Sequence, residues 1–360
     1  MPILKNYNHF NGKHWETGSI ANYFGHRGVK APHTNVPYSE AMLMGISGGI
    51  VMGYFTFAYE GYDPIMAILT RNTFNPWDTI LTRLGVVQEV RQTTKTNKAI
   101  ANLTDTLEDG IPAIIWADTF TLPYNALGYD EGMWGMFPLI VYGYDTEDDT
   151  VWIADRANVP LTITHDDLAT TWGRVKKDKH RLMTLDLPDP DKLGGAIQKG
   201  IWDTIKLFTE KPPKGSKHNF GFAAYQRWSK LLTKPGQKQS WAKVFPPGRD
   251  MIAGLACAYD RIAIFGSDGV ADAERTMFAD FLEEASLVLN QPDLRDVANQ
   301  FRASAQAWQK LGRAFLSDEI ESFGKIRTLL DQRHAHFLAD GNTALPHLQK
   351  IDQELEALIV

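Results

Sequence analysis

The sequence has 360 residues but only one cysteine, Cys257. A single cysteine excludes an internal disulfide framework and any metal cluster that needs several thiolates, and it is typical of proteins from a reducing compartment. The first residues also lack the apolar stretch of a secretory signal. We therefore expect a cytoplasmic protein.

Positive charge is not in excess either. The chain has 37 Lys and Arg residues against 43 Asp and Glu residues, which gives a formal net charge of −6. Surfaces that bind nucleic acids or anionic membranes are basic, so we expect no nucleic-acid partner.

The sequence also lacks an uninterrupted hydrophobic run. Residues 41–59 carry no charge, but four glycines interrupt them and no Lys or Arg asymmetry orients them. They predict a buried core segment, and we expect no membrane partner. The glycines match no phosphate-binding motif, and no His-x-x-x-His pair occurs, so we expect neither a cofactor nor a metal.

The hydrophobic periodicity predicts an α+β domain followed by helices. An antiparallel arrangement is indicated by a tight turn between two of the strand-like runs, at residues 145–150. The expected helices are 15–27, a short one from 39 to 45, one that begins at Asp63-Pro64, one from Asn75-Pro76 to 85, and one that ends at Gly110. The expected strands are 50–55, 111–118, 139–145 and 151–155.

A chain of this length exceeds what one hydrophobic core usually supports. The stretch 187–195 is rich in Pro, Asp and Gly and reads as a linker, and strand patterns vanish after it. We predict domains at 1–187 (α+β) and 188–360 (all-α). In the second domain, one helix face carries Val297, Phe301, Trp308, Leu311 and Phe315.

The segment Gly12 to Phe24 is the best candidate for a functional site. A glycine-entered turn places His14, Glu16, Thr17 and Ser19 at a helix N-terminus, where backbone N–H groups favour an anion or a nucleophile. The residue at the prime position is Trp15, which can be neither nucleophile nor base. The structural alternative is a packed helix with polar caps.

Four motifs in this order resemble the family of the butirosin-biosynthesis acyltransferase BtrH, over residues 10–165. The second half resembles the helical domain of unknown function that often follows it, through the segments 278–285 and Ala307-Trp308. The four motifs are Gly12-Lys13-His14-Trp15-Glu16-Thr17, the segment 38–49 around Glu40, Leu122-Pro123-Tyr124, and Val141-Tyr142-Gly143-Tyr144-Asp145.

The resemblance implies a papain-like cysteine-hydrolase domain that moves an acyl group from an acyl carrier protein to an amine. Such a domain has a Cys at the N-terminus of its first helix, a His at the start of the strand that leads to Gly-Tyr-Asp, and an Asp or Asn on the next strand. Here the Cys position holds Trp15 and the His position holds Phe137, while Asp155 remains. The nucleophile and the base are thus both replaced.

These replacements convert a polar cleft into an aromatic one, which favours flat or cationic small molecules. The expected aromatic walls are Trp15, Tyr124, Trp134 and Phe137. The expected polar groups are His14, Glu16, Thr17, Glu40 and Asp155, each of which also has a structural interpretation as a cap or turn former.

Three functions in specialised metabolism stay open. The first is a non-thiol enzyme in which Glu16, Glu40 or Asp155 does acid/base work such as cyclisation. The second is a catalytically silent protein that binds a small molecule, free or linked to an acyl carrier protein. The third is acyl transfer by Thr17 or Ser19 with His14 as base, although a triad needs a base held across the cleft by a third group. A homo-oligomer also stays open.

Overall fold

A computed structural model describes residues 2–59, 64–127, 132–210, 216, 218–266 and 269–359. The chain forms two compact units, and each unit is assembled from three separate segments. Unit 1 consists of Met1–Leu43, Ile80–Lys192 and Ala335–Gln349, and unit 2 of Met44–Thr79, Leu193–His334 and Lys350–Val360.

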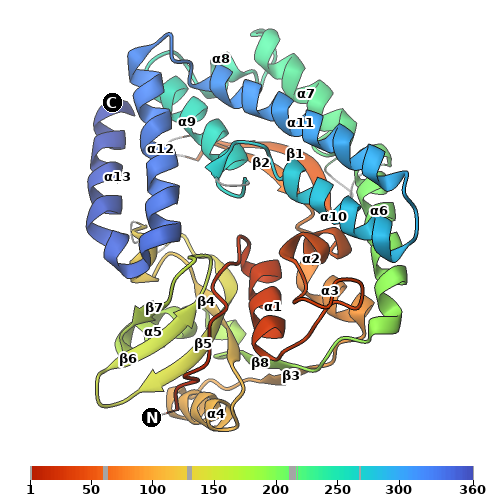
Figure 1. Ribbon diagram of the computed structural model, residues 1–360. Coiled ribbons are helices and arrows are strands. Elements are labelled where there is room, and N and C mark those ends of the chain that lie inside the picture. Colours follow the sequence, from red (N-terminus) through yellow and green to blue (C-terminus); the bar gives the residue numbers. More distant parts are fainter. Residues whose placement is uncertain are drawn as a thin grey trace. The chain divides into compact units, whose positions relative to one another are not determined.

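Unit 1 is built on a six-stranded antiparallel sheet with strand order β3-β8-β4-β5-β6-β7 (Figure 1). The antiparallel sheet and the α+β class are as predicted, and the turn at Asp145 pairs that residue with Thr150. The strands are β3 (Gln88–Arg91), β4 (Ala113–Asp118), β5 (Met136–Asp145), β6 (Thr150–Ala154), β7 (Leu161–Ile163) and β8 (Leu182–Leu185). β3, β7 and β8 have only three or four residues each, too few for an alternation pattern to predict them.

Helix α1 (Trp15–His26) lies against strand β5 (Figure 1). Its side chains Ile20, Tyr23 and Phe24 are completely buried, so α1 covers the sheet at this point. The Tyr23 hydroxyl fixes the helix to the sheet, since it donates to the Leu185 carbonyl (3.2 Å) and accepts from the Leu185 N–H (3.0 Å). The other helices of unit 1 are α4 (Thr96–Glu108), α5 (His165–Gly173) and the 3-10 turns η1 (Pro123–Asn125), η2 (Lys176–Asp178), η3 (Pro190–Lys192) and η5 (Gly341–Ala344).

Unit 2 combines a two-stranded antiparallel sheet with helices that pack on it. Its strands are β1 (Ile50–Phe57) and β2 (Ile65–Arg71), and its helices are α6 (Leu193–Thr209), α7 (Gly221–Thr233), α8 (Trp241–Val244), α9 (Arg249–Ala263), α10 (Arg275–Val288) and α11 (Leu294–Phe315). Four more helices begin in one unit and end in the other: α2 (Glu40–Ile46), α3 (Pro76–Leu84), α12 (Glu321–Asp340) and α13 (Leu345–Ile359).

The helix predicted at Asp63-Pro64 is wrong. Asp63 lies outside the described residues, and a strand begins at Ile65. The run from Ile65 to Leu69 is apolar and pairs along its length with β1. Pairing with a buried strand therefore overrides the helix-start signal of a proline. Residues 41–54 of the predicted core segment are buried, and Ile50, Val51 and Met52 are almost inaccessible to solvent, whereas Phe57 and Tyr59 at its end are exposed.

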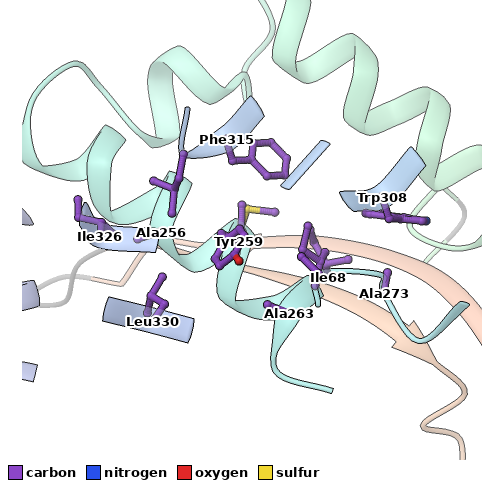
Figure 2. Packing of buried hydrophobic residues seen from close by; sticks show 14 of the residues in the cluster. Ile68, Ala256, Tyr259, Ala263, Ala273, Trp308, Phe315, Ile326 and Leu330 are labelled. Atoms are coloured by element: carbon purple, nitrogen blue, oxygen red, sulfur yellow. The ribbon is translucent and has the colours of Figure 1, made fainter. Parts of the chain in front are cut away.

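The core of unit 2 is rich in aromatic side chains. Figure 2 shows Trp308 and Phe315 of α11 in the same cluster as Tyr259 of α9. Trp228 of α7 stacks on Trp308, with 6.2 Å between ring centroids. Cys257 packs at the margin of this cluster and its Sγ donates to the Met66 carbonyl (3.3 Å), so it is a packed helix cysteine as expected.

The compact units differ from a single division after residue 187. Segment 44–79 carries β1 and β2, which pack against α6, α7 and α9 of the C-terminal half. Segment 335–349 in turn belongs to unit 1. Within the described ranges, none of the helices is both long and apolar enough to cross a membrane.

Candidate functional site

The chain crosses itself closely at the N-terminus of α1. A Cβ atom on Gly12 would lie 2.6 Å from the Gly18 Cα, and one on Gly18 would lie 2.7 Å from the Gly12 Cα. Real Cβ atoms do not approach backbone atoms so closely, so both positions require glycine. The crossing fixes the turn at residues 13–17, where the candidate residues lie.

Glu40, the first residue of α2, holds this turn. Its Oε2 accepts a hydrogen bond from the Lys13 N–H (2.6 Å), and its Oε1 accepts from the His14 N–H (2.8 Å). The Thr17 hydroxyl also donates to Oε1 (2.8 Å). Three donors at the start of one helix therefore share one carboxylate, which is the arrangement of a structural anchor.

His14 and Thr17 complete this anchor. The His14 Nδ1 lies 3.1 Å from the Thr17 Oγ1 and 3.4 Å from the Glu40 Oε1, and both side chains are buried. Because the single hydroxyl hydrogen of Thr17 is donated to Glu40, His14 does not receive it. The arrangement therefore differs from a hydroxyl nucleophile activated by an adjacent histidine.

Trp15 and Phe137, which the sequence predicted as walls of one aromatic cleft, stack on each other. Their ring centroids are 4.2 Å apart and the rings are 18° from parallel. Helix α1 and strand β5 hold the pair, and the Ser19 hydroxyl donates to the Pro138 carbonyl (3.2 Å) beside it. The two rings therefore cover each other.

Arg156 extends this stack. Its guanidinium carbon lies 4.4 Å from the Trp15 ring centroid and 5.0 Å from that of Phe337, which belongs to the returning segment of unit 1. The guanidinium also donates to the Asn125 side-chain oxygen (2.8 Å). The aromatic rings, for which the sequence predicted a flat or cationic ligand, thus contact a cation of the chain itself.

Asp155 is the counter-ion of Arg156. Its Oδ1 lies 3.5 Å from the Arg156 Nε, and its Oδ2 accepts from the Tyr124 hydroxyl (3.2 Å). Burial raises the pKa of Tyr124 well above its ordinary value, and the negative charge of Asp155 adds to the effect while Arg156 opposes it. Tyr124 therefore acts as a neutral donor that holds the carboxylate.

The structure thus gathers the predicted residues into two clusters at one end of α1. We call Trp15, Phe137, Arg156, Phe337, Asp155 and Tyr124 the aromatic stack, and His14, Thr17 and Glu40 the anchor. Glu16 is half-buried in the first turn of α1. Trp134 is exposed, with the Lys177 amine 5.1 Å from its ring.

Sequence reasoning missed three members of this region: Arg156, Asn125 and Phe337. Arg156 directly follows the predicted Asp155, and an acid followed by a base is too common to be a signal. Phe337 is separated from the others by most of the helical half, and no local pattern could have connected it. Among the described residues, no group of three or more His, Cys, Asp or Glu side chains is placed to hold a metal ion.

Residues 14–156 match the model of one protein family, described as butirosin biosynthesis protein H, N-terminal. The match begins at His14 of the anchor and ends at Arg156 of the aromatic stack. All members of both clusters except Phe337 lie inside it. No curated protein matches the chain.

Proposed function

Residues 14–156 belong to the family of the butirosin biosynthesis protein H N-terminal domain, and we propose that this chain is a catalytically silent member of it. The family is biosynthetic and acyltransferase-related. On this proposal, the protein has kept the domain and lost the transfer chemistry, and it contributes to a biosynthetic pathway by binding a small molecule.

One observation carries the proposal. Trp15 stands where the family resemblance places a nucleophile, and its ring is covered by Phe137 and by the guanidinium of Arg156. An indole cannot attack an acyl group, and a packed ring leaves little space for a substrate beside it. The two residues that replace the nucleophile and the base therefore pack against each other.

The two enzymatic alternatives find less support. For acid/base chemistry, Glu40 is engaged by three donors and Asp155 by Arg156 and Tyr124. Glu16 is the remaining carboxylate of that hypothesis. For hydroxyl-based acyl transfer, the hydrogens of Thr17 and Ser19 are donated to Glu40 and to the Pro138 carbonyl.

The test is a search for an acyl-enzyme. The full chain is incubated with an acyl pantetheine thioester and an amine, and both the intact mass of the protein and the amide product are measured. We expect neither an adduct nor amide above the rate without protein. Because Cys257 is the only thiol, the variant Cys257→Ala serves as the control for adventitious thioester exchange.

Matched variants separate the alternatives if product does appear. Loss of product in Thr17→Val or Ser19→Ala, with retention in Glu16→Gln, would restore hydroxyl-based transfer. A loss of about a hundredfold in Glu16→Gln, with retention in Thr17→Val, would restore acid/base catalysis. Either result would overturn the silent assignment.

A further inference from the structure

A cavity of about 780 Å³ lies within unit 2. Its walls come from α6, α7 and α11, with Ile50 of β1 and Arg275 of α10. Sites for small molecules commonly have volumes of about 300–1,000 Å³. Trp308, seen in Figure 2 among the core residues, belongs to both the core and the cavity wall.

The cavity wall runs from solvent to the core. At the outer end, Phe222 is 58% exposed and Ile205 is 44% exposed. At the inner end, Trp228 is 4% exposed and Trp308 is 5% exposed. This gradient describes a concave site with depth, and an exposed apolar rim of this kind marks binding surfaces in soluble proteins.

The three threonine hydroxyl groups of the wall are turned to the backbone. Thr204 donates to the Gly48 carbonyl (2.9 Å), while Thr209 and Thr233 donate to carbonyls one helical turn earlier, at 2.8 Å each. Their hydrogens are therefore used inside the protein. Among the described residues that line the cavity, none is Asp, Glu or Lys. The walls consequently suit a hydrocarbon chain better than a polar ligand.

One charged group lies at the inner end of the cavity. Arg275 is 1% exposed, and its guanidinium carbon lies 5.3 Å from the Trp308 ring centroid. It donates to the carbonyls of Thr70 (3.0 Å), Ala273 (2.6 Å) and Val51 (3.3 Å) and to the Tyr225 hydroxyl (3.1 Å).

None of these four acceptors is a carboxylate. The adjacent Glu274 is directed elsewhere, with its Oε1 3.8 Å from the Arg71 Nε and its Oε2 accepting from the Thr70 hydroxyl. A buried cation held only by neutral acceptors is stabilised by an anion that comes close to it. The cavity therefore has an electrostatic preference for a negative ligand.

Tyr225 connects this charge to the cavity. Its oxygen accepts from Arg275, so the phenol keeps its own hydrogen to donate. The hydroxyl belongs to a residue of the cavity wall, and the neighbouring cation polarises it into a stronger donor. A ligand oxygen at this point would accept from Tyr225 and lie near the guanidinium.

We propose that this cavity binds a long-chain carboxylate or acyl group. The chain lies along the apolar walls of α6, α7 and α11, and the carboxylate or carbonyl oxygen accepts from the Tyr225 hydroxyl near Arg275. This inference rests on the binding role proposed above and names the class of its ligand.

The experiment uses 11-(dansylamino)undecanoic acid, a fluorescent long-chain carboxylate, and measures energy transfer from tryptophan. Trp228 and Trp308 of the wall are the expected donors. The wild-type protein should bind one probe per chain, saturably. Ala307→Trp, which fills the cavity from α11, should weaken binding at least tenfold. Ala303→Trp, the same change at an exposed residue of α11 outside the cavity wall, should not.

The head group is tested by competition. Dodecanoate should displace the probe at about a tenth of the dodecanol concentration or less, since a hydrogen bond to a charged group is the stronger one. Tyr225→Phe should remove most of this preference while dodecanol binds as before, and thermal unfolding checks that the variant is folded.

Absence of saturable binding, or equal binding by Ala307→Trp and wild type, would overturn the inference. So would binding of an acyl carrier protein without binding of the free carboxylate, because the cavity would then be a protein-docking surface. These outcomes do not bear on the proposed silent function, which the search for an acyl-enzyme tests separately. An acyl-enzyme, conversely, would refute the silent assignment while the probe still bound.

Discussion

Each unit holds an arginine against aromatic rings, and the two arrangements differ in what surrounds the charge. In unit 1, Arg156 lies between the rings of Trp15 and Phe337 and pairs with the buried carboxylate of Asp155. In unit 2, Arg275 lies over Trp308 but meets only carbonyl and hydroxyl oxygens. The first charge is compensated by a carboxylate of the chain, whereas no described carboxylate forms an ion pair with the second.

This difference separates a structural cluster from a candidate binding site. Aromatic faces and a guanidinium favour a ligand only where one of them still has an unmet interaction. In the aromatic stack, the rings contact each other and the cation has its anion. In the cavity, Trp308 faces about 780 Å³ of space, and the nearby cation donates to carbonyl and hydroxyl oxygens among the described residues. The aromatic stack is therefore less suitable for a ligand than the cavity of unit 2.

The largest effect on the free energy of unfolding is expected when Arg156 is removed from the aromatic stack. Arg156→Met removes two ring contacts and leaves the Asp155 carboxylate buried without a cation. Loss of one partner of a buried pair costs about 3–5 kcal/mol of unfolding free energy, measured by urea titration. Adding Asp155→Asn should recover part of this loss, because it removes the uncompensated charge.

Arg27→Met is the matched control for this experiment. Arg27 is exposed and lies 5.9 Å from the Tyr23 ring centroid in the same unit. Exposed interactions of this kind contribute about 1 kcal/mol or less. If Arg156→Met destabilised the protein no more than Arg27→Met, the stack would not be a structural cluster, and the comparison between the units would fail.

A smaller effect on the free energy of unfolding is expected at the anchor, where it shows whether Glu40 has a structural or a catalytic role. Glu40→Gln keeps one acceptor oxygen but places an amide NH₂ against one of the two backbone donors, Lys13 or His14. We expect it to cost about 1–3 kcal/mol of unfolding free energy, and Thr17→Val about 1 kcal/mol. Both values come from thermal unfolding followed by circular dichroism.

An unchanged stability of Glu40→Gln would favour a catalytic role for Glu40. Replacement of a catalytic group commonly leaves stability unchanged or raises it, since active sites are held at some cost to the fold. A Glu40→Gln variant as stable as the wild type would therefore support the acid/base hypothesis and count against the anchor.

The sequence predicted the aromatic stack in part, for a physical reason. Trp15, Phe137 and Asp155 stand at positions that motif spacing can locate. They lie on or next to a helix and two adjacent strands, where a fixed spacing along the chain gives fixed relative positions. Arg156 and Phe337 take part through tertiary packing alone. The expected catalytic role of the carboxylates stays a prediction, because residue type does not reveal which donors a carboxylate will meet.

The sequence did not predict the cavity, for a different reason. The sequence shows one apolar face on α11 with Phe301, Trp308, Leu311 and Phe315, and such a face predicts burial against a core. The structure divides the face: Phe315 packs in the core, Phe301 lines the cavity, and Trp308 does both. Periodicity identifies a face that avoids water, but it does not tell whether protein or ligand covers the face.

The smallest effect concerns tyrosines, which the two units bury alike. Burial raises the pKa of Tyr142 in unit 1 and of Tyr54 in unit 2 to about 12 each, and it raises that of Tyr124 well above its ordinary value. An unfolded tyrosine releases its proton near pH 10. Below pH 10 both states keep the proton, so stability does not change with pH on this account. Above pH 10 only the unfolded state loses it, and stability falls as pH rises.

Each such tyrosine contributes a slope of at most about 1.4 kcal/mol per pH unit. We expect urea titrations between pH 9 and 11 to show constant stability up to about pH 10 and a decline beyond it, while the 295 nm absorbance of the buried phenolates appears together with unfolding. Tyr124→Phe should lose about 1 kcal/mol at pH 8, since Asp155 loses a donor, and should decline less steeply above pH 10. Ionisation of Tyr124 in the native protein near pH 10, seen as an absorbance step that the Phe variant lacks, would show that water reaches the aromatic stack. The stack would then be an accessible site like the cavity of unit 2, and the distinction between the two arginines would no longer hold.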